Sequence, residues 1–189
     1  MTSSPLFIFI TGGVRSGKSS FAERKAVEIA RQTGGQLIYL ATGVPSDSEM
    51  KERIFKHKQD RNAMQYHWKT VEQSVEIGEI AENFSEKEII LLDCVTTLLN
   101  NELFSVERKG GSLDFEKVKK SIVSGIIDLK NRVQTLIVVS NEILNEPLVR
   151  NHLVFTYGRL LGQIHQQLVR EADQVFLVES GIPIAMKNV

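Results

Sequence analysis

GGVRSGKS, residues 12–19, follows an apolar run at residues 6–10 and precedes a helix-like run at residues 20–32. The stretch fits G-x-x-x-x-G-K-[ST] between a strand and a helix, which is the context that a phosphate-binding loop needs. Its glycines let backbone N–H groups turn inward at a helix N-terminus, where the helix dipole also favours an anion. The alternative is a glycine-rich turn that binds nothing. Because both the motif and its context match, the sequence favours a triphosphate site.

The loop and the strand ends around it supply candidate catalytic and metal-binding residues. Lys18 is expected to reach the β- and γ-phosphates, and Ser19 to bind Mg²⁺. Asp93 ends a second apolar run, and the carboxyl ends of parallel strands meet at one edge of a sheet. We therefore expect Asp93 to be the second Mg²⁺ ligand; the alternative is a carboxylate that only caps the next helix. Glu142 follows another apolar run and is a weaker candidate for a metal, base or substrate contact.

Short apolar runs alternate with amphipathic ones, which is typical of βα units that form a mostly parallel sheet. No linker divides the chain, so we expect one nucleotide-binding domain over residues 1–189. The pattern predicts strands at residues 6–11, 36–41, 68–72, 88–93 and 134–140, with a closing hairpin at 174–179 and 182–186. It predicts helices at residues 20–32, 46–62, 74–84, 95–104, 114–131 and 148–172.

The composition excludes several classes of protein. The 189 residues carry 23 basic and 23 acidic side chains, so nothing suggests a nucleic-acid or membrane-surface protein. Cys94 is the only cysteine, which excludes an internal disulfide and a cysteine-rich metal site and fits a reducing compartment. No apolar stretch approaches the roughly 20 residues that a membrane-spanning helix needs. We expect a cytoplasmic protein with no membrane anchor.

The histidines are harder to interpret from their spacing. His57 lies where the apolar and cationic faces of the helix predicted at residues 46–62 meet. A single histidine on a helix is usually structural or solvated, so the pattern leaves its role open. The same holds for His67, His152 and His165, since no pair has a metal-ligand spacing such as H-E-x-x-H.

Seven stretches, taken together, resemble one family, the bifunctional adenosylcobinamide kinase/adenosylcobinamide-phosphate guanylyltransferases of cobalamin biosynthesis. The resemblance spans nearly the whole chain. The stretches are TGGVRSGKSSFAE at residues 11–23, LIYLATG at 37–43, D-x-E-M-K-x-R-I-x-x-H-K at 47–58, WKTVE at 68–72, LDCVTT at 92–97, VSNE at 139–142, and SGIP at 180–183 with Lys187.

The resemblance implies a fold, an assembly and a pair of reactions. The fold is a three-layer P-loop, RecA-like α/β fold, a mostly parallel sheet with helices on both faces and an antiparallel C-terminal hairpin. The assembly is a homotrimer with active sites between subunits. The enzyme phosphorylates the aminopropanol hydroxyl of adenosylcobinamide with ATP or GTP, then transfers GMP from GTP to that phosphate, giving adenosylcobinamide-GDP. The histidine of R-I-x-x-H, here His57, carries GMP as a covalent intermediate.

The resemblance also implies the site residues. His57 and Lys18 are catalytic, Ser19 and Asp93 hold Mg²⁺, and Lys58 and Arg61 neutralise the α-phosphate or the leaving pyrophosphate. The nucleotide pocket carries over to Gly12, Gly13, Val14, Arg15, Ser16, Gly17, Lys18, Ser19, Ala41, Thr42, Gly43, Lys58, Gln59, Asp60, Arg61, Glu72 and Asp93.

This chain departs from the family pattern in one region. The family has G-x-G-I-V-P and then R-x-F-R-D-x-x-G-R-x-N-Q, where this chain has ILNEP at residues 143–147 and YGRLLGQIHQ at 157–166. The family's later Arg is Gln163 here, and its Asn is His165. Two alternatives therefore stay open: an enzyme that keeps only one of the two transfers, and a RecA-like ATPase or nucleotide-dependent switch. Against the second, no basic or aromatic-interleaved stripe suggests a polymer partner.

Overall fold

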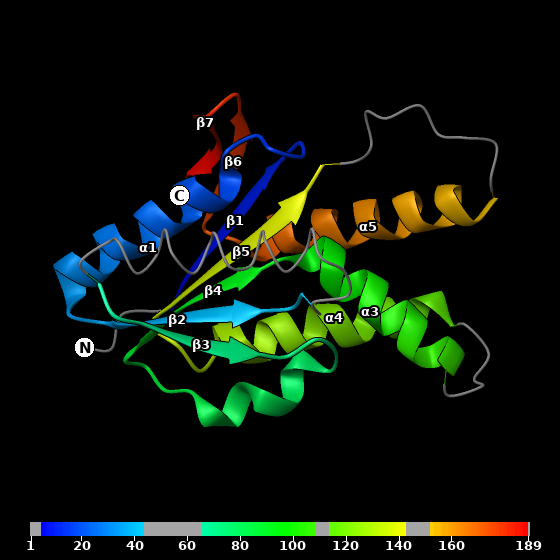
Figure 1. Ribbon diagram of the computed structural model, residues 1–189, viewed down its shortest axis with the longest axis horizontal. Helices are drawn as coiled ribbons and strands as arrows, with labels where there is room; N and C mark the ends of the chain where they lie inside the picture. The colour runs from blue at the N-terminus through cyan, green and yellow to red at the C-terminus, as the bar shows by residue number, and fades with distance from the viewer. Residues whose placement is uncertain (1–4, 44–65, 109–113, 143–151, 189) are drawn as a thin grey trace.

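The computed structural model describes residues 5–43, 66–108, 114–142 and 152–188 (Figure 1). The helix predicted at residues 46–62, which carries His57 and residues 58–61, lies outside the described residues. No helix in the described part of the chain has both the length and the apolar composition needed to cross a membrane.

All described strands belong to one sheet (Figure 1). Every pairing is parallel except that of the last two strands, which form an antiparallel hairpin. The predicted mostly parallel sheet and its C-terminal hairpin are therefore confirmed. In spatial order the strands are β3 (Trp68–Glu72), β2 (Gln36–Ala41), β4 (Glu88–Asp93), β5 (Thr135–Asn141), β1 (Leu6–Gly12), β6 (Gln174–Glu179) and β7 (Ile182–Asn188).

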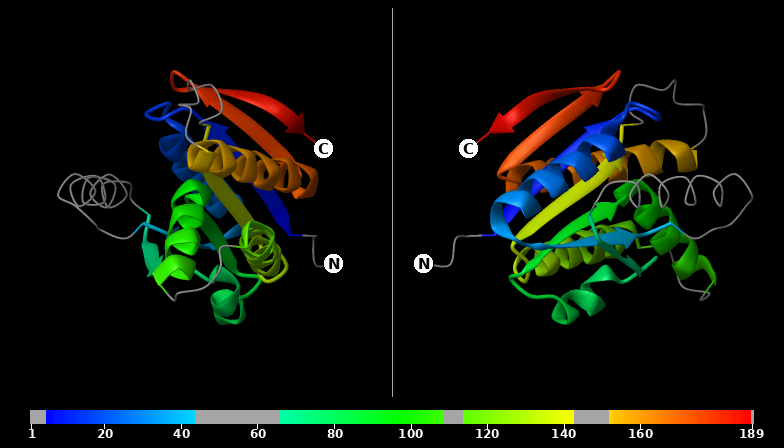
Figure 2. Two further views of the ribbon diagram at one scale, coloured as in Figure 1. Left: turned by 90° about the vertical axis from the view of Figure 1, so that its right-hand side faces the viewer. Right: turned by 60° about the vertical axis from the view of Figure 1, so that its left-hand side comes forward.

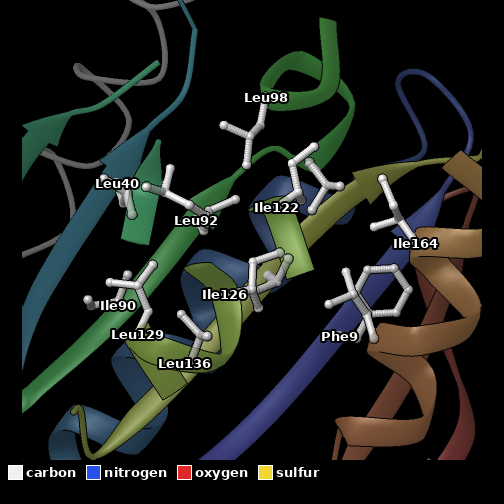
Figure 3. Close-up of a cluster of buried hydrophobic side chains, with 14 of the residues drawn as sticks. Phe9, Leu40, Ile90, Leu92, Leu98, Ile122, Ile126, Leu129, Leu136 and Ile164 are labelled. Carbon is white, nitrogen blue, oxygen red and sulfur yellow. The ribbon is translucent and has the colours of Figure 1, made fainter. Parts of the chain in front are cut away.

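Helices cover both faces of the sheet, as predicted (Figure 2). On one face lies α1 (Lys18–Thr33), and on the other lie α3 (Val95–Arg108), α4 (Phe115–Lys130) and α5 (His152–Glu171). Successive strand residues alternate between two apolar cores, since Ile8 and Ile10 pack with α1 while Phe9 packs on the opposite side. Figure 3 shows the second core, where Phe9 and Leu92 meet Ile126 and Ile164. Burial on both faces explains why the strands read as unbroken apolar runs.

The helix predicted at residues 74–84 is wrong in type and length. The structure has a 3₁₀ helix, η1 (Ile77–Asn83), preceded by Glu76 with a left-handed φ of 52°. A left-handed residue interrupts α-helical geometry, so the helix cannot begin at residue 74. The Glu76 N–H donates to Oε1 of Glu102 in α3 at 2.7 Å, which holds the backbone of Glu76 against α3. The local sequence pattern was overridden by a contact with another element.

Two glycines bring η1 and α4 close together. A Cβ on Gly125 would lie 2.9 Å from the N atom of Gly78 and 2.9 Å from Cγ1 of Ile77. An alanine in an exposed helix interior normally stabilises the helix by up to about 1 kcal/mol relative to glycine. Here the methyl group has no room, because its neighbours include backbone atoms.

Gly125→Ala is expected to lower the free energy of unfolding by about 1–3 kcal/mol, because it overpacks this contact. Urea denaturation followed by circular dichroism measures the change. Ser124→Ala, at the exposed neighbouring position of α4, is the matched control and should shift the midpoint little. An increase in stability for Gly125→Ala would show that the two elements do not pack this closely.

Candidate functional site

The strand register collects the predicted site residues at the carboxyl edge of the sheet. Ala41 of β2 pairs with Glu72 of β3 on one side and with Asp93 of β4 on the other. Nearer the centre of the sheet, Gly12 at the end of β1 pairs with Asn141 at the end of β5. The phosphate loop, the two acidic residues and the end of β2 therefore lie along one edge, where open α/β sheets bind ligands.

The loop can take its shape only with glycine at two positions. A Cβ on Gly12 would lie 2.3 Å from the carbonyl oxygen of Val178 in β6, so no other residue fits there. Gly17, the N-cap of α1, has a φ of 90°, which favours glycine. Between them the Ser16 N–H donates to the carbonyl of Gly13 at 3.1 Å, which folds the loop back on itself. The motif glycines are thus explained by backbone geometry in this chain.

The start of α1 is suited to an anion. No side chain caps this N-terminus, and the first turn of the helix holds no acidic residue. A helix of this kind presents its first backbone N–H groups and the positive end of its dipole. Lys18 adds a charge at the same place: its side chain is 7% exposed, and its Nζ donates to the carbonyl of Gly13 at 3.0 Å. The arrangement concentrates positive charge inside the loop, as phosphate binding requires.

Asp93 is oriented by a side chain that the sequence analysis did not single out. The hydroxyl of Tyr39, which is buried in β2, donates to Oδ2 of Asp93 at 3.0 Å. Asp93 and Ser19 together offer a carboxylate and a hydroxyl, the hard oxygen donors that Mg²⁺ prefers. Among the described residues no group of three or more His, Cys, Asp or Glu side chains could hold a metal. This donor set fits an Mg²⁺ ion that arrives with a nucleotide, because such ions take most ligands from phosphates and water.

Thr42 ties the ends of β2 and β4 together. Its hydroxyl accepts a hydrogen bond from the Cys94 N–H at 2.8 Å and lies 2.9 Å from the Cys94 carbonyl oxygen. The amide of Asn101 in α3 donates to the Thr42 carbonyl at 2.8 Å. The Thr42 side chain is fully buried, so it serves the shape of this edge rather than facing solvent.

Cys94 is excluded as a nucleophile at this edge. Burial, reinforced by the neighbouring Asp93 carboxylate, raises the pKa of its thiol. Near pH 7 the group is therefore the unreactive thiol, since the thiolate is the reactive form.

The C-terminal hairpin reaches the phosphate loop, which the sequence analysis did not predict. The N–H of Gly181, in the turn between β6 and β7, donates to the carbonyl of Ser16 at 2.8 Å. At the other end of the hairpin, Lys187 donates to carbonyls at the end of α5, including that of Val169 at 3.2 Å. The resemblance marked residues 180–183 and Lys187 as a motif, but a pattern along the chain cannot show what they touch.

The remaining residues of the predicted pocket either lie at the surface of the loop and the end of β2 or fall outside the described residues. Val14 and Arg15 are exposed at the tip of the loop, and Gly43 is partly buried just before the described part of the chain is interrupted. His57, Lys58, Gln59, Asp60 and Arg61 lie outside the described residues. The described site is therefore the phosphate end of the predicted pocket.

The family model and the sequence relatives that match this chain all describe proteins of cobinamide or adenosylcobalamin biosynthesis. A family model described as cobinamide kinase / cobinamide phosphate guanyltransferase matches residues 8–186. Three curated relatives cover nearly the whole chain. The bifunctional adenosylcobalamin biosynthesis protein CobU of Escherichia coli K12 is 32% identical over 189 residues, which are 96% of this chain and 100% of that protein. The CobU protein of Salmonella typhimurium is 33% identical, with coverages of 96% and 100%, and the CobP protein of Pseudomonas aeruginosa is 31% identical, with coverages of 95% and 96%.

Two solved structures show a weak likeness to this chain. The flagellar accessory protein FlaH of Methanocaldococcus jannaschii has a TM-score of 0.49 at 14% identity, covering 97% of this chain and 78% of that one. A KaiC-like protein of Pyrococcus horikoshii OT3 has a TM-score of 0.49 at 13% identity, with coverages of 91% and 70%. A likeness at these values shows no function for this chain.

Proposed function

Since this chain belongs to the cobinamide kinase / cobinamide phosphate guanyltransferase family, we propose how its own residues perform the two transfers of that family. The protein is a cobinamide kinase and a cobinamide phosphate guanylyltransferase of adenosylcobalamin biosynthesis. The family match extends over residues 8–186, including the stretches that depart from the family pattern, so it favours both transfers over an enzyme with one. It also favours synthesis over a nucleotide-dependent switch.

For the kinase step, the triphosphate lies in the loop with its γ-phosphate at the Gly12–Gly13 end. The support is the position of Lys18, whose Nζ is held at the Gly13 carbonyl and is the group expected at the β- and γ-phosphates. Ser19 and Asp93 would hold Mg²⁺, with Tyr39 orienting the Asp93 carboxylate. When bound, Mg²⁺ neutralises negative charge on the phosphate oxygens. The oxygen of the substrate hydroxyl attacks the γ-phosphorus and its proton passes to solvent. The bond from the γ-phosphorus to the β–γ bridging oxygen breaks, and the nucleoside diphosphate leaves.

For the guanylyl step, a ring nitrogen of neutral His57 attacks the α-phosphorus of GTP. A P–N bond forms, the bond to the bridging oxygen breaks, and pyrophosphate leaves. An oxygen of cobinamide phosphate then attacks the same phosphorus, which frees His57 and gives cobinamide-GDP. Lys58 and Arg61 offset the negative charge of the departing pyrophosphate. The assignment of these residues rests on the resemblance and on the phosphate end of the pocket described above.

One observation carries the proposal: the strand register aligns Glu72, Ala41 and Asp93 at the edge of the sheet that also carries the phosphate loop, whose lysine points into the loop. The test is to incubate the purified protein with cobinamide, Mg²⁺ and either ATP or GTP, and to follow products by liquid chromatography and mass spectrometry. We expect cobinamide phosphate first and cobinamide-GDP once GTP is present. One product without the other would leave a single-activity enzyme, and nucleotide hydrolysis with neither product would favour the switch.

We also propose the assembly and the compartment. A homotrimer is implied by the resemblance, and the edge strand β7 supports an oligomer because it exposes the apolar side chains of Ile182, Ile184 and Met186. A cytoplasmic location is supported by the single unpaired cysteine.

A further inference from the structure

A chain of buried hydrogen bonds joins α5 to the end of β5. His165 Nε2 lies 2.7 Å from Oγ of Ser140, and that Oγ lies 3.3 Å from Oγ1 of Thr96. Thr96 Oγ1 in turn accepts the backbone N–H of Asn141 at 2.9 Å. The side chains of His165, Ser140 and Thr96 are 8%, 0% and 9% exposed, respectively. Neither transfer, as assigned above, uses any of the three.

The chemistry of the groups allows one continuous direction for this chain. A backbone N–H can only donate, so Thr96 Oγ1 accepts from Asn141. Thr96 can donate its own proton to Ser140, although the geometry also fits the reverse. Ser140 can then donate to His165, provided that Nε2 carries no proton. Burial lowers the pKa of His165, and the Glu142 carboxylate opposes this shift with a smaller effect, so the ring is neutral near pH 7. Phe9 of β1 packs against the ring with its centroid 5.3 Å away and contributes no charge.

The end of β5 is held from two sides. On one side the hydrogen-bond chain from His165 reaches the Asn141 N–H through Thr96. Tyr157 of α5 also donates to the Thr96 carbonyl at 3.1 Å. On the other side the Glu142 N–H donates to the carbonyl of Gly12, the first residue of the phosphate loop, at 2.8 Å. Asn141 and Glu142 are thereby fixed beside the Gly12–Gly13 end of the loop.

We infer that His165 is a positioning residue for phosphoryl transfer: through Ser140 and Thr96 it holds Asn141 and Glu142 beside the γ-phosphate end of the phosphate loop. The inference rests on the proposed function for the identity of that end. His165 stands where this chain departs from the family pattern, and its ring reaches from α5 to β5 to close the hydrogen-bond chain. The kinase step should depend on the end of β5 more than the guanylyl step does. The kinase step reacts at the γ-phosphorus, whereas the guanylyl step reacts at the α-phosphorus.

Two substitutions at the same position separate hydrogen bonding from packing. His165→Phe keeps an aromatic ring against Phe9 but cannot accept from Ser140. His165→Gln can place Oε1 near the position of Nε2 and restore the acceptor. We expect His165→Phe to lower kcat for cobinamide phosphorylation about tenfold, the scale of one unsatisfied buried polar group. Its KM for the nucleotide and its GMP adduct formation should stay within about twofold of wild type, and His165→Gln should recover most of the loss.

Ser140→Ala provides a second route to the same break if His165→Phe folds poorly. It should reproduce the loss in kcat, and the double variant should lose no more than either single one, because both remove the same chain. The inference would be overturned if His165→Phe and Ser140→Ala both kept the wild-type kcat. It would also be overturned if His165→Gln lost as much kcat as His165→Phe, or if the losses of the two single variants added in the double variant.

The pH profile gives a readout that a purely structural role would not move. Protonation turns Nε2 from an acceptor into a donor, so the wild-type kinase kcat should fall on the acid side as His165 becomes charged. His165→Gln cannot titrate and should lose this acid limb. An unchanged acid limb in His165→Gln would contradict the role of the ring.

A measurement without turnover keeps this inference separate from the proposed function. Hydrogen exchange in the nucleotide-free protein should show faster exchange of the Asn141 and Glu142 amides in His165→Phe and Ser140→Ala, with protection restored in His165→Gln. Unchanged protection would overturn the inference even in an active enzyme. Absence of cobinamide phosphorylation by wild type, with these exchange changes present, would instead overturn the proposed function alone.

Discussion

His57→Ala protein is expected to gain no mass when incubated with GTP and Mg²⁺, whereas the wild-type protein should gain one GMP. The reason is that alanine offers no nitrogen to attack the α-phosphorus, so the covalent intermediate cannot form. Loss of the nucleophile costs on the order of 10⁶ in kcat in a well-studied protease, and guanylyl transfer should fall to background here. Intact-protein mass spectrometry measures the adduct, which should be acid-labile in the wild type because its P–N bond is hydrolysed in acid.

His67→Ala is the matched control, because His67 is an exposed histidine just outside the segment that carries His57. It should form the adduct as wild type does. The kinase activity of His57→Ala should stay within a few fold of wild type, since the γ-phosphate is transferred directly to the hydroxyl. An adduct on His57→Ala, or none on wild type, would remove His57 from the mechanism.

Lys18→Ala is expected to lower kcat/KM for both transfers by at least about 10²–10³-fold, the scale of losing a preorganised charged group at a transferring phosphate. The proposed function binds the triphosphate of both steps in the same loop, and Lys18 Nζ lies inside that loop at the Gly13 carbonyl. Steady-state kinetics with each substrate give the two ratios, and calorimetric titration with GTP gives the loss of nucleotide affinity.

Lys25→Ala tests whether any lysine of α1 has this effect. Lys25 lies in the same helix, where its Nζ pairs with Glu28 at 3.4 Å. Exposed pairs of this kind contribute about 0–1 kcal/mol, so neither activity should change much. Unchanged activities in Lys18→Ala would mean that the phosphate loop serves neither transfer.

The sequence predicts the parts of this site that depend on local chain geometry. A glycine-rich turn between a buried strand and a helix has few alternatives, so the loop, its glycines and Lys18 follow from spacing alone. Asp93 follows in the same way, because parallel strands bring their carboxyl ends to one edge. The role of His57 comes only from the resemblance, since periodicity places many residues on one helix face without selecting among them.

The features that the sequence does not predict are contacts between elements distant along the chain. Tyr39 reads as one more apolar residue of β2, and only the pairing of β2 with β4 brings its hydroxyl to Asp93. His165 resembles any histidine on a helix until α5 packs across β1 and β5. The prediction of a helix at residues 74–84 was wrong for the same reason, because the sequence pattern does not show that the backbone N–H of Glu76 donates to Glu102 of α3.

The position of β1 constrains how the chain can reach its active form. This first strand lies between β5 and β6, which are synthesised long after it, and the loop that follows it is braced by the turn at Gly181. During translation β1 has neither of its native partner strands until β5 and β6 have been synthesised. Contacts between segments so distant along the chain also form slowly. The phosphate loop therefore gains its final support only when residues 174–188 have emerged from the ribosome. Nascent chains that lack residues 174–188 should therefore bind nucleotide poorly, and chains that contain these residues should bind it.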